Sequence, residues 1–329
     1  MAAYSGIRKL LWGLLGGALL VFGAWRLYAA YKASHPFPPI PMTTKAQPAR
    51  LHDDVAFLTG LQPARNYRNL TSLNQAADYV RREFEKLGLK VEEQTYQADG
   101  RTYRNIITSL GPPDAERIVV GAHYDVCGDQ PGADDNASAV AGLLETARLL
   151  HAQQPRLKHR LDLVAYPLEE PPYFATDQMG SAVHAKSLHD AGVKVRAMIC
   201  YEMIGYFRDE PGSQNFPNPL LAALYPDTGN FITVVGKMGQ ESIVSRIKDL
   251  MKANSAIDVQ SINLPESMGL AGLSDHRNYW RYGYEAVMIN DTSFLRNPNY
   301  HQSTDTIDTL DFKRMAEVVN GVYAAILGL

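Results

Sequence analysis

The chain has 329 residues, of which 46% are hydrophobic and 20% charged, and its formal net charge is −3. This balance is that of an ordinary globular protein and excludes a chain that is disordered throughout. Neither an excess of positive charge nor a basic cluster indicates binding to nucleic acid. Only two cysteines occur, Cys127 and Cys200, which excludes a disulfide framework and a cysteine-rich zinc site. The two can be paired, or they can be two buried thiols.

The amino-terminal segment differs from the rest of the chain. Residues 10–25 carry no charge and follow Arg8 and Lys9. A membrane-spanning helix needs about 20 apolar residues, so a span here has to continue past Arg26. The long Arg26 side chain would then extend its charged end to the membrane surface. We expect residues 1–34 to be a single-pass membrane anchor that leaves the remainder outside the cytoplasm. A cleaved signal peptide, which would make the protein secreted, is the main alternative, although no convincing cleavage site follows.

A proline-rich segment separates this anchor from the remainder. Residues 35–50 include the stretch "HPFPPIPM", whose four prolines favour an extended, semi-rigid linker. Residues 51–329 contain no further linker and no repeat. They are therefore expected to form one domain, the catalytic domain, near the upper end of single-core size.

Helical and strand patterns alternate along that domain. Apolar residues at helical spacing predict helices over 73–88, 136–153, 180–191, 241–253 and 311–329. Short apolar runs predict strands over 117–123, 160–170, 194–202 and 285–291. Three of these runs are continuously hydrophobic, as in strands buried on both faces. The predicted fold class is α/β, with a mixed, mostly parallel central sheet and helices on both faces.

Acidic residues and a histidine follow the ends of all four predicted strands. In chain order these residues are His123, Asp125, Glu169, Glu170, Glu202 and Asp291. The carboxyl ends of parallel strands meet at one edge, and like charges gathered there cost several kcal/mol unless they share protons or bind cations. Oxygen and imidazole ligands without a thiolate favour zinc or a similar divalent ion. Taken singly, each motif has an ordinary alternative; Asp135, for example, can cap a helix.

Six motifs in order, "GAHYD", "PGADDNAS", "EE", "YEMIGY", "SDH" and "NYH", resemble the co-catalytic zinc exopeptidases, typified by bacterial aminopeptidases. Glutaminyl cyclases and glutamate carboxypeptidases are related to them. The resemblance covers about residue 51 to the end and implies a phosphorylase/hydrolase-like fold with two zinc ions. It also implies a cis peptide between the two aspartates of "DD". The implied metal ligands are His123 and Glu202 on one ion, Glu170 and His301 on the other, and Asp134 as the bridge.

The same resemblance implies three further roles. Asp125 would hold the imidazole of His123 in its ligating tautomer. Glu169 would be the general base that takes the proton of a zinc-activated water. Tyr300 would donate a hydrogen bond to the tetrahedral oxyanion.

Two positions depart from the usual pattern of the family, and two segments allow more than one interpretation. Glu202 stands where the family commonly has aspartate, which can change the geometry or the metal preference, and Ala139 replaces a glycine that often follows the serine. Residues 274–276 offer a serine suited to a helix cap and two residues expected beside the site. Residues 171–181 form an insertion that is either a wall of the substrate pocket or a surface loop packed on its own aromatics. The side chains considered for that wall are Tyr173, Phe174 and Met179.

The resemblance implies a zinc aminopeptidase that acts on peptides, and the expected anchor would attach it to a membrane. A glutaminyl-peptide cyclotransferase is an alternative that would carry one zinc. A carboxypeptidase is another, although no basic residue is evidently placed to bind a terminal carboxylate. A receptor-like ectodomain that kept the fold is the non-enzymatic alternative, but such proteins typically lose ligands, and none is missing here. Cys127 has no role in any of these hypotheses.

Overall fold

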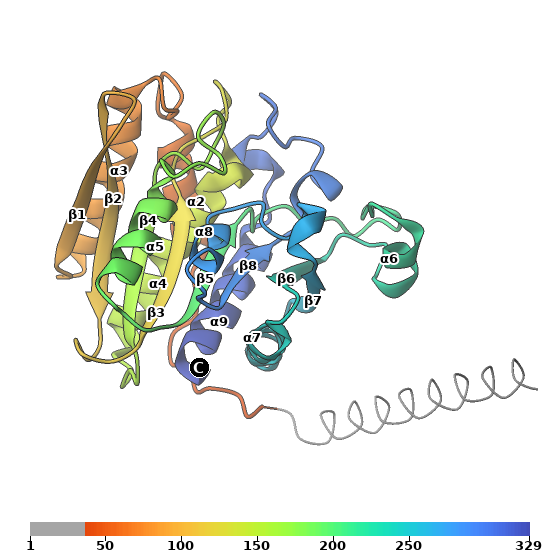
Figure 1. Cartoon of the computed structure of the whole chain (residues 1–329). Coiled ribbons are helices and arrows are strands. Elements are labelled where there is room, and N and C mark those ends of the chain that lie inside the picture. The colour runs from red at the N-terminus through yellow and green to blue at the C-terminus, as the bar shows by residue number, and fades with distance from the viewer. Residues whose placement is uncertain (1–36) are drawn as a thin grey trace, which may run out of the picture. The chain divides into compact units, whose positions relative to one another are not determined.

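The structure is a computed structural model that describes residues 37–329 (Figure 1). The predicted apolar span at residues 10–25 lies outside the described residues. Within residues 37–329, no helix combines the length and the apolar character needed to cross a membrane.

Within the described part of the chain, eight strands form one sheet in the order β1-β2-β4-β3-β5-β8-β6-β7. The central strands β4, β3, β5 and β8 are parallel, whereas β1, β2 and β6 each have antiparallel neighbours. The prediction of a mixed α/β fold is therefore confirmed. The strands are β1 Val91–Ala98, β2 Arg101–Leu110, β3 Arg117–His123, β4 Arg160–Tyr166, β5 Val195–Glu202, β6 Phe231–Lys237, β7 Asp258–Leu264 and β8 Ala286–Asn290.

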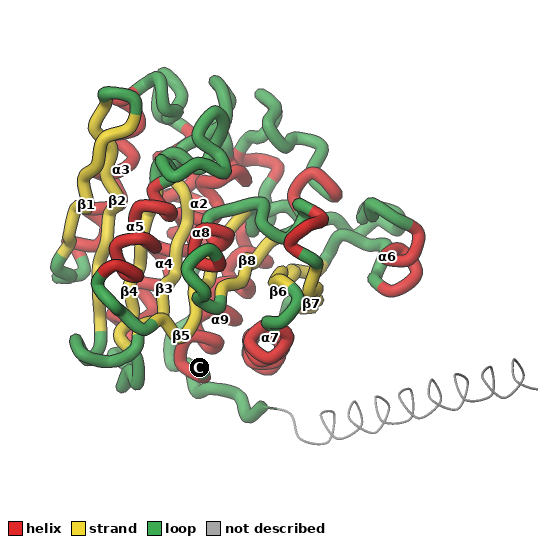
Figure 2. Tube along the Cα trace, viewed as in Figure 1, coloured by secondary structure: helices red, strands yellow, loops and turns green. Residues whose placement is uncertain are grey.

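Helices cover both faces of the sheet (Figure 1). Helices α2, α3, α4, α7 and α9 pack against one another on one face, and α5 and α8 pack together on the other. The helices are α2 Pro48–Thr59, α3 Leu70–Lys86, α4 Ala139–Gln153, α5 Gly180–Asp190, α6 Pro219–Leu224, α7 Glu241–Asn254, α8 His276–Trp280 and α9 Phe312–Gly328. Figure 2 shows long loops above the sheet edge where the central parallel strands end.

Two of the predicted boundaries differ from the structure near that edge. β4 ends at Tyr166, so Glu169 and Glu170 lie in a turn and not on the strand. The helix expected from residue 136 begins at Ala139, because residues 133–138 form a wide turn with non-helical backbone angles inside it. Both differences place acidic residues on turns above the sheet.

The expected linker is shorter than predicted. The compact unit begins at Ile40 instead of residue 51. The Ile40 N–H donates to Asn254 Oδ1 at 2.6 Å, and the Ala46 N–H donates to Asn320 Oδ1 at 2.9 Å. Residues 40–50 are therefore part of the packed domain, since their backbone groups find partners on α7 and α9.

Candidate metal centre

The residues of the site, which include all the predicted metal ligands except Asp134, come from separate elements at the same edge of the sheet. His123 is the last residue of β3 and Glu202 the last of β5. Glu170 lies in the turn after β4, Asp135 in the wide turn before α4, and His301 in the segment between β8 and α9. The structure thus brings together residues that are up to 178 positions apart, as His123 and His301 are.

One carboxylate lies between two histidines. Asp135 Oδ1 is 3.6 Å from His123 Nε2, and Asp135 Oδ2 is 3.1 Å from His301 Nε2. A second carboxylate accompanies each histidine: Glu202 Oε2 is 3.3 Å from His123 Nε2, and Glu170 Oε2 is 3.3 Å from His301 Nε2. The five side chains form two triplets that share Asp135.

These separations suit metal coordination. In a tetrahedral zinc site with bonds of about 2.1 Å, neighbouring ligand atoms are about 3.4 Å apart. Glu170 Oε1 is buried and has no hydrogen-bond partner, which is unfavourable for a carboxylate oxygen unless a cation binds it. His123, Asp135 and Glu170 also form a group whose ligand atoms lie within 4.8 Å of one another. The residues therefore fit a pair of divalent ions.

Asp134, predicted as the bridging ligand, does not face this cluster. Its carboxylate accepts hydrogen bonds from the Gly205 N–H at 3.0 Å and from Asn297 Nδ2 at 2.8 Å. Burial and the neighbouring Asp291 raise its pKa well above the usual range. The candidate bridge is thus its neighbour Asp135. Asp135 faces the histidines and Asp134 does not, because the backbone turns here and consecutive side chains point into different surroundings.

The turn that carries these aspartates is fixed from both sides. The backbone N–H groups of Asp134 and Asp135 donate to the two carboxylate oxygens of Asp305, at 2.9 and 3.1 Å. The cis peptide predicted between Asp134 and Asp135 is instead between Asp135 and Asn136. Asn136 Oδ1 accepts the Met203 N–H at 2.9 Å. No motif marks Asp305 in the sequence, because an aspartate in a polar segment carries no local signal.

Asp125 lies on the far side of the His123 ring, as expected. His123 Nδ1 is 3.2 Å from the Asp125 carbonyl oxygen and 3.4 Å from its carboxylate. The same carboxylate accepts the N–H groups of Glu169 at 3.2 Å and Glu170 at 3.1 Å. Asp125 therefore orients His123 and also holds the turn that presents both glutamates.

Glu169 is close to the cluster and is not part of either triplet. Its Oε2 is 3.8 Å from His123 Nε2, and the residue is 5% exposed. Burial raises its pKa well above the usual range; His123 opposes this shift, and Glu202 adds to it. The ring of Tyr300 stacks on His301, with ring centroids 3.8 Å apart. Burial and the adjacent carboxylates also raise the pKa of Tyr300.

The charges of the ligand side chains depend on one another. Burial and Asp135 raise the pKa of Glu170 to about 8. Burial disfavours the charged imidazole of both histidines. Hydrogen bonds to Asp135 and Glu170 nevertheless raise the pKa of His301 to about 10. The charges of Glu202 and Glu169 likewise raise the pKa of His123. A cation bound here would displace protons from these groups, because metal ligands bind in their deprotonated forms.

An apolar pocket adjoins the cluster. It contains about 930 Å³ of open space, part of it continuous with solvent, and Glu202 and Tyr300 line it together with many apolar side chains. Its lining comes from β6, β7 and β8, from the region of α6, and from the loops before α8 and after β8. The apolar lining includes Phe216, Leu221, Ile262, Leu273, Met288 and Phe294.

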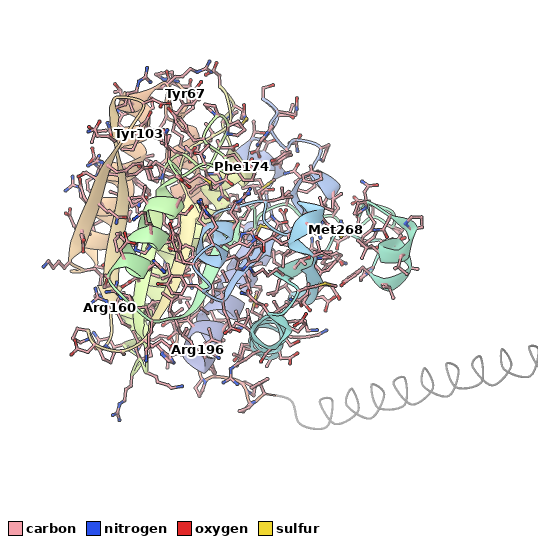
Figure 3. All side chains as sticks on the ribbon, viewed as in Figure 1. Tyr67, Tyr103, Arg160, Phe174, Arg196 and Met268 are labelled. Carbon is pink, nitrogen blue, oxygen red and sulfur yellow. The ribbon has the colours of Figure 1, made fainter. Side chains whose placement is uncertain are left out.

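The insertion considered as a wall of the substrate pocket does not line this one. Tyr173 is buried, donates its hydroxyl to Asp99 at 2.9 Å, and packs edge-on against Tyr67 and Tyr103, which Figure 3 labels at the same end of the sheet. Met179 is fully buried. The Arg277 guanidinium lies 4.9 Å from the Phe174 ring centroid. The insertion is thus a loop packed on its own aromatics and on the strand edge.

The "SDH" segment, residues 274–276, contacts the site through Ser274. Ser274 donates its hydroxyl to Glu202 Oε2 at 2.6 Å, so it positions a candidate ligand and does not cap a helix. Asp275 is buried, and neither of its carboxylate oxygens has a hydrogen-bond partner in the structure. His276 Nε2 lies 2.7 Å from the Ala271 carbonyl oxygen, and burial lowers the pKa of His276 to about 4.

The family of the chain follows from comparison with known proteins. Residues 105–326 match Peptidase family M28, and the chain belongs to this family. The resemblance to co-catalytic zinc exopeptidases is thereby confirmed.

Its relatives include proteins with and without a described activity. The chain is 45% identical over 292 residues to the uncharacterized protein YfbL of Escherichia coli (strain K12), covering 86% of this chain and 89% of that protein. It is 28% identical to leucine aminopeptidase 1 of Arthroderma otae, covering 65% of this chain and 54% of that protein. The chain therefore spans about half the length of this second relative.

Solved structures with the same fold include the Legionella pneumophila aminopeptidase LapA, with a TM-score of 0.68 and 19% identity over 86% of this chain and 72% of that one. A glutaminyl cyclase of Bacteroides thetaiotaomicron has a TM-score of 0.64 and 20% identity over 87% of this chain and 99% of that one. At these identities the likeness establishes the fold, and the two activities differ.

Proposed function

We propose that the protein is a zinc-dependent aminopeptidase with two metal ions per chain. The observation that carries this proposal is the carboxylate of Asp135, whose two oxygens face different histidines, each accompanied by its own glutamate. A single metal ion would need only one of these triplets. Two dications placed close together repel, and an anion shared between them offsets that repulsion.

Two zinc ions held in this way would supply Lewis acidity, which polarises a carbonyl and lowers the pKa of a water molecule. Glu169 is the proposed general base, because its carboxylate lies beside the cluster without belonging to either triplet. It would accept the proton of the attacking water and pass it to the leaving amine. Tyr300, stacked on His301, is proposed to donate to the developing oxyanion.

The apolar pocket suits a substrate with a large apolar amino-terminal side chain. Glu202 and Tyr300 lie where the pocket meets the cluster, so a side chain in the pocket would belong to the residue next to the scissile bond. The rim exposes further apolar groups, among them Phe294 at 47% exposure. We therefore expect leucine, methionine or phenylalanine amides to be better substrates than glutamate or lysine amides.

The alternatives predict other preferences. A glutaminyl cyclase would convert peptides with amino-terminal glutamine without adding water, and would carry one ion. A carboxypeptidase would need a cation for the terminal carboxylate; Arg277 is one candidate, because its charge interacts with Glu169. A receptor-like protein would bind no metal and turn over none of these substrates.

One preparation tests the proposal. The protein is freed of metal with a chelator, reloaded with zinc, and assayed on aminoacyl amides, amino-terminal glutamine peptides and free-acid peptides. We expect apolar aminoacyl amides to be hydrolysed only after reloading. In Glu169→Gln, kcat should fall by about 10²- to 10⁴-fold with both ions retained, the usual contribution of a general base. Full activity of this variant would refute the assignment of the base.

We further propose that residues 1–34 anchor the protein in a membrane, with the catalytic domain outside the cytoplasm. The support is the uncharged run at residues 10–25. The full chain should sediment with membranes after a high-salt wash, whereas a chain starting at residue 37 should remain in the supernatant. Release of the full chain by salt alone would contradict the anchor.

A further inference from the structure

Cys127 lies next to one of the two triplets. It is in the loop that follows β3, is half-buried and forms no disulfide. Its sulfur, Glu170 and His301 offer three ligand atoms that all lie within 4.8 Å of one another. This thiol is not one of the five proposed metal ligands, it is not the proposed general base, and it does not line the apolar pocket.

A second observation at the same place indicates a cation. Glu170 is 5% exposed, and while its Oε2 lies 3.3 Å from His301 Nε2, its Oε1 has no hydrogen-bond partner. A buried carboxylate oxygen without a donor is costly unless a positive charge compensates it. The thiol therefore lies beside a buried glutamate that has one carboxylate oxygen without a partner.

Given the proposed function, in which Glu170, His301 and Asp135 hold a metal ion, we propose that Cys127 is a thiolate ligand of that ion. On coordination the thiol proton leaves to solvent and a sulfur–metal bond forms, with no change of oxidation state. With Cys127 this ion has four protein ligands, whereas the ion at His123 and Glu202 has three. Four protein ligands are typical of a closed site, and three leave a position for water or substrate.

This asymmetry agrees with the position of the proposed base. Glu169 Oε2 is 3.8 Å from His123 Nε2, which belongs to the triplet with the open position. The sulfur ligand also gives the closed site a preference for softer ions such as zinc, cobalt or cadmium over magnesium or manganese. The two sites should therefore differ in metal selectivity.

Titration of metal-free full chain with cobalt(II) tests the proposal, because a cobalt–thiolate bond has a near-ultraviolet charge-transfer band that oxygen and nitrogen ligands lack. The band should appear in the unmodified protein and be absent in Cys127→Ser. One of the two cobalt ions should also bind at least about tenfold more weakly in Cys127→Ser, since even outer partners contribute that much. Cys200→Ala is the matched control, because Cys200 is the only other cysteine; it should keep the band.

A second measurement needs no variant. Alkylation of Cys127 in the unmodified protein, followed by mass spectrometry, should be slowed at least tenfold by two equivalents of zinc and not by magnesium. Two bound cobalt ions without the band, or a band that persists in Cys127→Ser, would overturn the proposal and leave the two-metal site intact. Failure of the unmodified protein to bind cobalt at all would refute both this inference and the proposed function.

Discussion

Asp135 and Asp134 are neighbours of the same type, and only one of them faces the histidines. Asp135 has one oxygen toward each histidine, while Asp134 accepts donors from Gly205 and Asn297. Both side chains are buried and both are acidic, so no composition or spacing rule separates them. The sequence could predict that "DD" carries a ligand, but which aspartate does so depends on a turn whose backbone is tied to the distant Asp305.

Substitution of each aspartate separates the two roles. Asp135→Asn should lower the zinc content from two ions per chain to one or none and reduce kcat at least 10²-fold, because both ions lose a shared ligand. Asp134→Asn should retain both ions, since its partners are protein donors. Zinc quantification of both purified variants checks this. Normal zinc content in Asp135→Asn would contradict the assignment of the bridge.

Protonation of His184 makes the stability of the fold depend on pH, and this effect does not involve the metal ions. It is buried with Nδ1 2.6 Å from the Tyr279 hydroxyl, and burial lowers its pKa to about 4. A histidine in the unfolded chain has a pKa near 6.5, so the unfolded state binds the proton first. The stability that this neutral ring contributes is complete above pH 6.5 and is lost as the pH falls toward 4. The full loss is about 3 kcal/mol.

Urea unfolding of the metal-free protein between pH 7.5 and 4.5 measures this loss. His184→Gln should be less stable at pH 7.5 and should show a smaller fall in unfolding free energy over that range. His52→Gln is a matched control at an exposed histidine and should change nothing. An identical pH dependence of the unmodified protein and His184→Gln would contradict the assignment.

Among the elements, four mostly apolar strands were predicted from the sequence, whereas β6, which is equally buried, was not. β3, β4, β5 and β8 are almost entirely buried, so burial on both faces leaves runs in which most residues are apolar. β1 is an edge strand with alternating exposure and the sequence "VEEQTYQA", and β7 at the opposite edge is mostly half-buried. Polar residues interrupt both sequences, and the apolar signal is lost.

Three helices on one face meet at a single arginine. The Arg148 guanidinium on α4 contacts Asp54 of α2 at 2.5 and 2.9 Å, and Glu83 of α3 at 2.8 Å. Its side chain is 13% exposed and that of Asp54 is 2% exposed. Because removing one partner leaves a buried charge uncompensated, Arg148→Ala should cost about 3–5 kcal/mol.

Arg81 on α3, whose side chain is more exposed than that of Arg148, provides the comparison. It pairs with Glu85 at 3.2 Å with a third of its side chain exposed, and pairs of this kind contribute less than about 1 kcal/mol. Denaturant unfolding of Arg148→Ala and Arg81→Ala at pH 7.5 therefore should give a large and a small loss, respectively. Equal losses would show that the Arg148 contacts do not join the helices as described.

At the scale of the whole molecule, the site lies above the carboxyl ends of β3 and β5 and in the loops next to them. The rule that ligands bind beyond the carboxyl ends of parallel strands predicted this location from the sequence. The pocket was not predictable, because apart from Glu202 and Tyr300 its lining residues lie outside the six motifs. The packed segment at residues 40–50 was likewise missed, since its prolines resemble those of a free linker.

Metal binding should therefore stabilise the entire domain. An ion present at 100 times its dissociation constant contributes about 2.7 kcal/mol, which for a domain of this size raises Tm by roughly 5 to 10 °C. Differential scanning calorimetry of the metal-free and zinc-loaded protein measures this shift. Asp135→Asn should show a markedly smaller shift than the unmodified protein, and equal shifts in the two proteins would place the zinc elsewhere.

The most direct test of the two-metal site is anomalous diffraction at the zinc edge from crystals of the zinc-loaded protein. We predict two peaks about 3.5–4 Å apart, the usual spacing in such sites. One peak should lie between Asp135, His123 and Glu202, and the other between Asp135, Glu170 and His301. A single peak, peaks beside Asp134, or no peak at this edge of the sheet would contradict the account.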